Sequence, residues 1–90
     1  FQDRVDGCLN QLRARPNLAN KLDVARERQF VGFDAYQQVI NSGVDVVLLC
    51  TPPHFRPMHL EAAIRARKHV FCEKPMAVDG PGVRRVAALY

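Results

Sequence analysis

Hydrophobic residues recur along the chain with two spacings, one typical of amphipathic helices and the other of buried strands. Near the start, apolar side chains fall at i, i+3, i+4 and i+7, which predicts a helix over about residues 2–15: Val5, Cys8, Leu9 and Leu12. Pro16 marks the end of this helix. Residues 17–29 are polar and weakly patterned, which indicates a loop that can include some helix.

The next segment predicts a strand, a helix and a second, more deeply buried strand. Residues 30–33, FVGF, are expected to form a short strand. Asp34 followed by Gln37 resembles a capping box, and the helix that it starts can stop at Gly43, which tolerates positive φ. Residues 44–50, VDVVLLC, are almost continuously apolar, as in a strand covered on both faces within a parallel sheet.

The last third of the chain repeats this alternation of helix and strand. Residues 51–53, Thr-Pro-Pro, end the strand because proline cannot donate to a sheet ladder. Residues 55–67 predict a helix of about 11 residues, and 68–73 predict a second buried strand. Asp79 is a good N-cap for a final helix with the apolar stripe Val83, Val86, Ala87 and Tyr90.

The order of elements is therefore helix, short strand, helix, strand, helix, strand, helix. Strand–helix–strand crossovers of this length make parallel strands with right-handed connections. The sequence thus predicts the α/β class, as a doubly wound parallel sheet with helices on both faces.

Composition narrows the possible partners. The chain has 90 residues and a net charge of +4, but the basic residues are scattered and aromatic residues are not interleaved with them. This pattern is typical of a solvated basic surface, so we expect no nucleic-acid partner. No apolar stretch approaches the ~20 residues that cross a bilayer, so we expect no membrane contact.

The cysteines argue against a disulfide framework or a zinc site. Cys8, Cys50 and Cys72 form no CxxC and no pattern with histidine, so we expect no bound metal. Cys50 and Cys72 lie in apolar runs, where cysteine behaves as a small hydrophobic residue. This usage fits a reducing compartment and a cytoplasmic protein, with export of the parent protein left open.

Candidate chemistry gathers where the two buried strands end, because ligands of open α/β sheets bind beyond the carboxyl ends of the strands. Thr51 offers a hydroxyl, and Pro52 and Pro53 stiffen the turn and expose carbonyls, which suits a flat polar ligand edge. A plain strand-to-helix turn is the alternative. His54 is either a ligand contact or a solvated loop histidine.

The second strand ends at Glu73 and Lys74, followed by Pro75. A lysine over the crevice can exchange a proton with a hydroxyl group or hold a developing alkoxide. The glutamate beside it can balance charge or bind ribose hydroxyls. The alternative is a surface ion pair, worth under about 1 kcal/mol.

These residues also carry a family resemblance. Residues 45–79, DVVLLCTPPHFRPMHLEAAIRARKHVFCEKPMAVD, resemble the nucleotide-binding domain of the glucose–fructose oxidoreductase/inositol dehydrogenase/rhizopine catabolism (Gfo/Idh/MocA) family. The features that match are the strand ending in Thr-Pro, the 17-residue step from Thr51 to Lys68, and the segment KHVFCEKP.

The resemblance implies an oxidoreductase that binds NAD or NADP on a Rossmann-type domain and transfers hydride to or from a sugar, cyclitol or similar polyol. It implies that Lys74 is catalytic and meets both cofactor and reacting hydroxyl, and that the parent is a homo-oligomer. The Lys74–Pro75 bond is a candidate cis peptide. The residues expected to contact the cofactor are Thr51, Pro52, Pro53, His54, Glu73, Lys74 and Pro75.

The chain also departs from the family pattern. The first strand, the loop G-x-G-x-x-G and the acidic ribose ligand are absent, and the catalytic histidine of the substrate domain would lie beyond residue 90. Pro53 stands at a common asparagine, Arg56 at a common histidine, and Arg67 at a usual glycine, which is expected to distort or fray the helix end.

We therefore expect residues 1–90 to be part of a cofactor domain, with the C-terminal substrate domain outside this chain. This piece alone is predicted to be inactive and to bind NAD weakly or not at all. A non-catalytic nucleotide- or sugar-binding domain of the same fold is the alternative.

Overall fold

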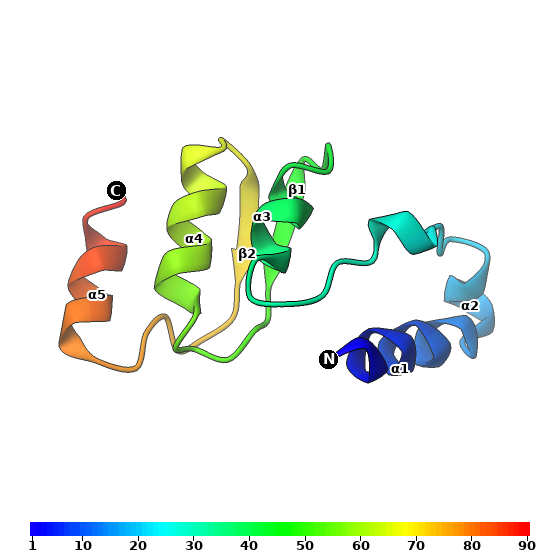
Figure 1. Cartoon of the computed structure of the whole chain (residues 1–90). Helices are drawn as coiled ribbons and strands as arrows, with labels where there is room; N and C mark the ends of the chain where they lie inside the picture. The colour runs from blue at the N-terminus through cyan, green and yellow to red at the C-terminus, as the bar shows by residue number, and fades with distance from the viewer. The chain divides into compact units, whose positions relative to one another are not determined.

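The computed structural model describes all of residues 1–90, which form two compact units, Phe1–Ala35 and Tyr36–Tyr90 (Figure 1). None of the helices has the length and apolar character that crossing a bilayer requires.

The first unit is helical. It contains α1 (Gln2–Arg13), α2 (Pro16–Ala19) and a 3₁₀ turn at Arg26–Arg28, so the predicted first helix and the partly helical loop after it are confirmed. Leu9 is the buried residue of the predicted stripe, whereas Cys8 is exposed.

The predicted strand over residues 30–33 is wrong, because this segment is irregular in the structure. Strand preference reflects packing against neighbouring strands, and the only ladder in the chain joins two later segments. Gly32 has a φ of +116°, which turns the backbone out of the extended region. The exposed ring of Phe33 contacts Phe1 edge-on, with ring centroids 6.1 Å apart.

The second unit alternates helices and strands in the predicted order. It contains α3 (Ala35–Ile40), β1 (Val46–Leu49), α4 (Arg56–Arg65), β2 (His69–Cys72) and α5 (Gly80–Ala87). The two strands pair in parallel in a single two-stranded sheet, as the α/β prediction requires. Helix α4 packs against both strands, and α5 packs against α4 (Figure 1).

The core lies between the sheet and α4, with contributions from α3 and α5. Its buried members are Ile40, Val47, Leu49, Leu60, Ala63 and Val86. The other face of the sheet is open in this chain: Val46 is 56% exposed, Leu48 67% and Phe71 56%. The expected cover on both faces of the strands is therefore not found here, because α5 packs on α4 and not on the second face of the sheet.

Helix α5 buries a different face from the one that its sequence predicts. Val86 is buried, but Val83, Ala87 and Tyr90 are exposed, so the predicted stripe is wrong in those three positions. Gly82 packs tightly against the loop before the helix, since a Cβ there would lie 2.8 Å from the Cβ of Ala77, and it also faces α4, where the Cγ of Pro57 would be 3.4 Å away. The side of the helix that carries Gly82 therefore faces inward, whereas Val83 is exposed.

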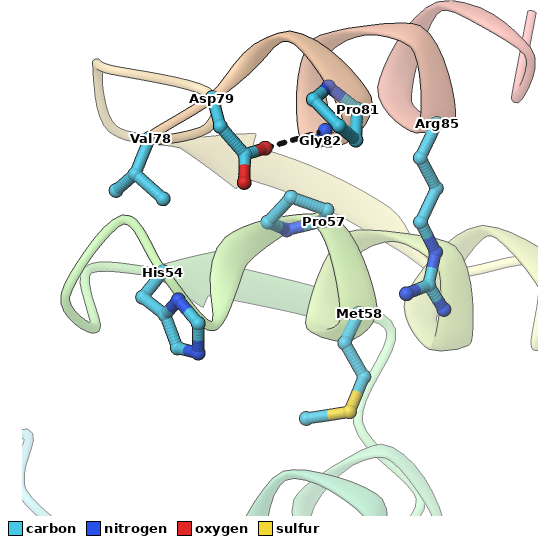
Figure 2. Close-up of a pocket in the computed structure, with 8 residues that line it drawn as sticks. All are labelled: His54, Pro57, Met58, Val78, Asp79, Pro81, Gly82 and Arg85. Carbon is cyan, nitrogen blue, oxygen red and sulfur yellow. Dashed lines mark hydrogen bonds between the residues drawn. The ribbon is translucent and has the colours of Figure 1, made fainter.

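The start of α5 is capped as predicted. The Oδ1 atom of Asp79 accepts a hydrogen bond of 2.7 Å from the backbone N–H of Gly82 (Figure 2). Glu61 of α4 joins the two helices through an ion pair with Arg85 of α5, in which Oε2 lies 2.5 Å from Nη2. Its other oxygen, Oε1, lies 2.8 Å from Nη2 of Arg65 within α4. Hydrogen bonds from Arg85 and then Arg65 hold the pKa of Glu61 below its ordinary value.

The C-terminus of α4 closes in a Schellman motif, so the predicted distortion of this helix end is wrong. The N–H of Arg67 donates to the carbonyl of Ile64 at 2.9 Å, and the N–H of Lys68 donates to the carbonyl of Ala63 at 3.0 Å. This motif requires a left-handed residue, and Arg67 supplies it with a φ of +55°. Glycine would adopt that conformation without the steric cost that a Cβ imposes.

Arg67→Gly should therefore stabilise the chain by about 1 kcal/mol, because it removes a left-handed penalty of roughly that size. For a domain of this length the thermal midpoint should rise by roughly 4–8 °C, measured by circular dichroism. Ala66→Gly is the matched control, since Ala66 has a φ of −82° and gains nothing from glycine. A lower midpoint for Arg67→Gly would contradict the assignment of strain to this residue.

Candidate functional site

The two strand ends that carry the candidate residues lie next to each other. The parallel register pairs Leu49 with Cys72, and the N–H of Glu73 donates to the carbonyl of Leu49 at 3.1 Å. The segments CTPPH and CEKP therefore leave the sheet at the same edge, as the sequence predicted for neighbouring strands.

Most of the candidate side chains at this edge are open to solvent. Six are exposed and Pro53 is half-buried; the exposed ones are Thr51, Pro52, His54, Glu73, Lys74 and Pro75. The predicted cis peptide between Lys74 and Pro75 is present. The alternative of an ion pair between Glu73 and Lys74 is not found, because the ion pairs of the chain join other residues. The ammonium group of Lys74 is therefore available to a ligand.

Thr51 is oriented by a buried histidine of α4. Its Oγ1 lies 3.2 Å from Nδ1 of His59, which is 7% exposed. The imidazole stacks on Tyr36, with ring centroids 4.3 Å apart, and on Phe55 at 5.9 Å. Burial lowers the pKa of His59 below its ordinary value of 6.5, so the ring is neutral at pH 7 and hydrogen-bonds the hydroxyl without bringing a charge to the site.

This lowered pKa makes the stability of the chain depend on pH. The unfolded chain takes up a proton on His59 near its ordinary pKa, about 6.5, whereas the folded chain resists protonation until a lower pH. The free energy of unfolding should therefore be highest above about pH 6.5 and should fall as the pH is lowered from there toward the folded-state pKa.

Denaturant unfolding at about pH 7.5 and pH 5.5 measures this effect on either side of the ordinary histidine pKa. His59→Gln should flatten the difference between the two values, and His54→Gln, at an exposed histidine, is the matched control. An unchanged pH dependence in His59→Gln would show that another group is responsible.

The side chain of Arg56 connects the two strand ends. It is 3% exposed, and its guanidinium donates through Nη2 to the carbonyl of Thr51 at 2.5 Å and through Nη1 to the carbonyl of Pro75. Its Nε is buried without a partner. Sequence reasoning noted this arginine only as a replacement for histidine. Consecutive prolines lack N–H donors, so a basic residue one turn later was the available signal.

Of the two cysteines predicted to behave as small hydrophobic residues, Cys72 is half-buried, whereas Cys50 is exposed, so the prediction is wrong for Cys50. Burial raises the pKa of the Cys72 thiol, which favours the protonated form, and the three cysteines of the chain are free. The side chains also bring together no group of three or more His, Cys, Asp or Glu residues that could hold a metal ion.

A hollow of about 230 Å³ lies between the first turns of α4 and α5 (Figure 2). Its walls include His54 and Met58 from the α4 side and Val78 and Arg85 from the α5 side. His54 is thus the one candidate residue in this hollow, which does not take in Thr51 or Lys74.

Comparison with known proteins gives a consistent result. The chain matches a family model described as "Oxidoreductase family, NAD-binding Rossmann fold" over residues 11–90. It is 36% identical over 78 residues to an inositol 2-dehydrogenase of Pseudomonas savastanoi pv. phaseolicola, covering 83% of this chain and 21% of that protein. No solved structure gives a significant match.

Two further relatives are similar over shorter stretches. A 2,7-anhydro-N-acetylneuraminate hydratase of Escherichia coli is 35% identical over 61 residues, 67% of this chain and 16% of that protein. A 1-carboxy-3-chloro-3,4-dihydroxycyclohexa-1,5-diene dehydrogenase of Comamonas testosteroni is 53% identical over 38 residues, 42% of this chain and 10% of that protein. The chain thus spans between a tenth and about a fifth of the length of these relatives. Since the family model covers residues 11–90, this chain belongs to the Gfo/Idh/MocA family of oxidoreductases, with its NAD-binding Rossmann fold.

Proposed function

We propose that the complete protein is an NAD- or NADP-dependent oxidoreductase of a sugar, cyclitol or similar polyol, and that this chain forms part of its cofactor domain. The observation that carries the proposal is the pair of adjacent strand ends, one presenting the Thr51 hydroxyl and the other an exposed Lys74 without an ion-pair partner. Adjacent strand ends of an open α/β sheet are where such folds bind ligands.

The residues present fit the nicotinamide end of the cofactor. The hydroxyl of Thr51 is held by a neutral imidazole, and the exposed groups around it are polar or small. Contacts would come from Thr51, Pro52, Pro53 and His54 on one strand end and from Glu73, Lys74 and Pro75 on the other. No G-x-G-x-x-G segment occurs in these 90 residues, so the pyrophosphate contacts are not part of this fit. When bound, the nicotinamide supplies the hydride acceptor or donor.

Lys74 is proposed as the catalytic residue of this chain. Its side chain accepts the proton that the reacting hydroxyl loses during oxidation and returns a proton to that oxygen during reduction, so that negative charge does not build up there. The carboxylate of Glu73, on the neighbouring position, accepts hydrogen bonds from ribose hydroxyls. Both side chains extend from the end of β2, so their backbone is fixed by the ladder to β1.

The relatives support the proposed substrate class. The inositol 2-dehydrogenase is similar to most of this chain, which supports a cyclitol or related polyol. A hydration reaction is a second candidate, because the Escherichia coli relative is named as a hydratase. The two reactions differ in whether reduced nicotinamide accumulates during turnover.

The test is an assay of the complete protein with NAD or NADP against a panel of cyclitols and sugars, following reduced nicotinamide by absorbance. We expect turnover with at least one polyol and none from the 90-residue chain alone. A substrate consumed without accumulation of reduced cofactor would favour the hydratase candidate. Binding of nucleotide or sugar without any turnover would favour a non-catalytic domain.

A further inference from the structure

We infer that Arg56 is a positioning residue of the proposed site: its buried guanidinium sets the spacing between the strand end that carries Thr51 and the one that carries Lys74. This inference rests on the proposed function. Lys74 can meet a substrate held beside the nicotinamide only if the two strand ends keep a fixed separation, and the sheet ladder does not extend far enough to impose it.

The hydrogen bonds between β1 and β2 end before Thr51 and Lys74, the residues of the proposed site. The last of these hydrogen bonds runs from the N–H of Glu73 to the carbonyl of Leu49. Beyond that point Arg56 makes the connection, since it donates to the carbonyl of Thr51 at 2.5 Å and to the carbonyl of Pro75. Pro75 is the residue after Lys74, so this bond holds the backbone next to the proposed catalytic group.

An arginine suits this task because its planar guanidinium presents several N–H donors in a fixed geometry. The two prolines after Thr51 lack N–H donors, and their own carbonyls accept from the backbone N–H groups of Phe55 and Arg56. The carbonyl of Thr51 instead takes its partner from the Arg56 side chain. Arg56 is 3% exposed and takes part in none of the ion pairs of the chain. Buried charged groups need hydrogen-bond partners, and here the two carbonyls accept from the two Nη atoms, while Nε has none.

The backbone of Arg56 belongs to a helix that packs against the sheet. Arg56 is the first residue of α4, which packs against both strands through Leu60 and Ala63. The same helix carries His59, which bonds the Thr51 hydroxyl at 3.2 Å. One helix therefore holds the Thr51 end through two side chains and the Lys74 end through one.

The kinetic test compares Arg56→Ala and Arg56→Lys in the complete protein. Displacing a reacting group by about 1 Å can cost roughly 100-fold in rate, so Arg56→Ala should lower kcat by about that factor and raise the KM for NAD or NADP. Arg56→Lys should fall between Arg56→Ala and wild type, because an ammonium cannot reproduce the fixed fork. If Arg56→Ala only reduced the amount of folded enzyme, the apparent kcat would fall, but the KM for the cofactor and the KM for the substrate would not change.

Arg65→Ala is the matched control. It removes the same charge from the same helix, at a side chain that is 77% exposed and does not reach the strand ends. Its kcat and KM values should stay close to those of the wild type. Wild-type kcat and KM in Arg56→Ala would overturn the positioning role.

A measurement without turnover separates this inference from the proposed function. In ¹⁵N-labelled protein, the Nη protons of Arg56 should give resolved, slowly exchanging signals, and Arg56→Lys should shift the amide signals of Thr51 and Lys74. Fast exchange of these protons, or unshifted amides, would refute the link even if Arg56→Ala fails to fold. If the Nη protons exchange slowly but the protein oxidises no polyol, the proposed function is refuted, while the connection of the two strand ends by Arg56 is retained.

Discussion

Lys74→Ala in the complete protein should lower kcat by roughly 10²–10⁴-fold, the range that a positioned acid–base group contributes. The substitution removes the side chain that is proposed to meet the reacting oxygen and leaves the backbone that pairs with β1. The cofactor KM should change much less than kcat, because an interaction used mainly in the transition state is lost. Steady-state kinetics with the preferred polyol measure both parameters.

Lys68→Ala is the control for this substitution. Lys68 precedes the opposite end of the same strand, and its backbone N–H, which the substitution retains, closes the Schellman motif. Wild-type turnover in Lys74→Ala would mean that the lysine is an ordinary solvated residue at a strand end. A comparable loss of turnover in Lys68→Ala would mean that the effect comes from the strand and not from the proposed catalytic group.

Leu49→Ala should destabilise the 90-residue chain by about 2–5 kcal/mol, since large-to-small changes in a core lose both transfer energy and packing. Leu49 is 4% exposed and belongs to the core between the sheet and α4. A loss of this size is a large part of the stability of a small domain, so the variant should be largely unfolded. Urea unfolding followed by circular dichroism gives the free energy of unfolding.

Leu48→Ala tests the same chemical change on the adjacent residue of the same strand. Leu48 points to the open face of the sheet and is 67% exposed, so its truncation should cost well under the core value. Equal losses in the two variants would show that the open face is covered in solution. Tolerance of Leu49→Ala would instead place the core elsewhere.

The sequence was sufficient for the alternation of helices and strands because it depends on local patterns. The buried strand over residues 44–50, the helix over 55–67 and the Asp79 cap are all present, with strand ends one or two residues inside the predicted limits. Two of the wrong predictions have a common cause. A strand at 30–33 would need a neighbouring strand, and the face of α5 that is buried depends on how this helix packs against α4. Both depend on tertiary packing.

The site shows the same division. The strand ends were predictable, because an apolar run followed by Thr-Pro or by Glu-Lys-Pro can be recognised in the sequence as the end of a buried strand. The roles of Arg56 and His59 were not, since each acts on a backbone or hydroxyl group that only folding brings near. The proposed roles of Thr51, Glu73 and Lys74 stay predictions for the complete protein.

The left-handed arginine at the end of α4 has a genetic consequence. Every arginine codon becomes a glycine codon through a single change of its first base, so the expected stabilising substitution at Arg67 is one point mutation away. Natural proteins commonly retain such unused reserves of stability. Random mutagenesis of this sequence with selection for heat resistance would therefore reach Arg67→Gly without passing through an intermediate.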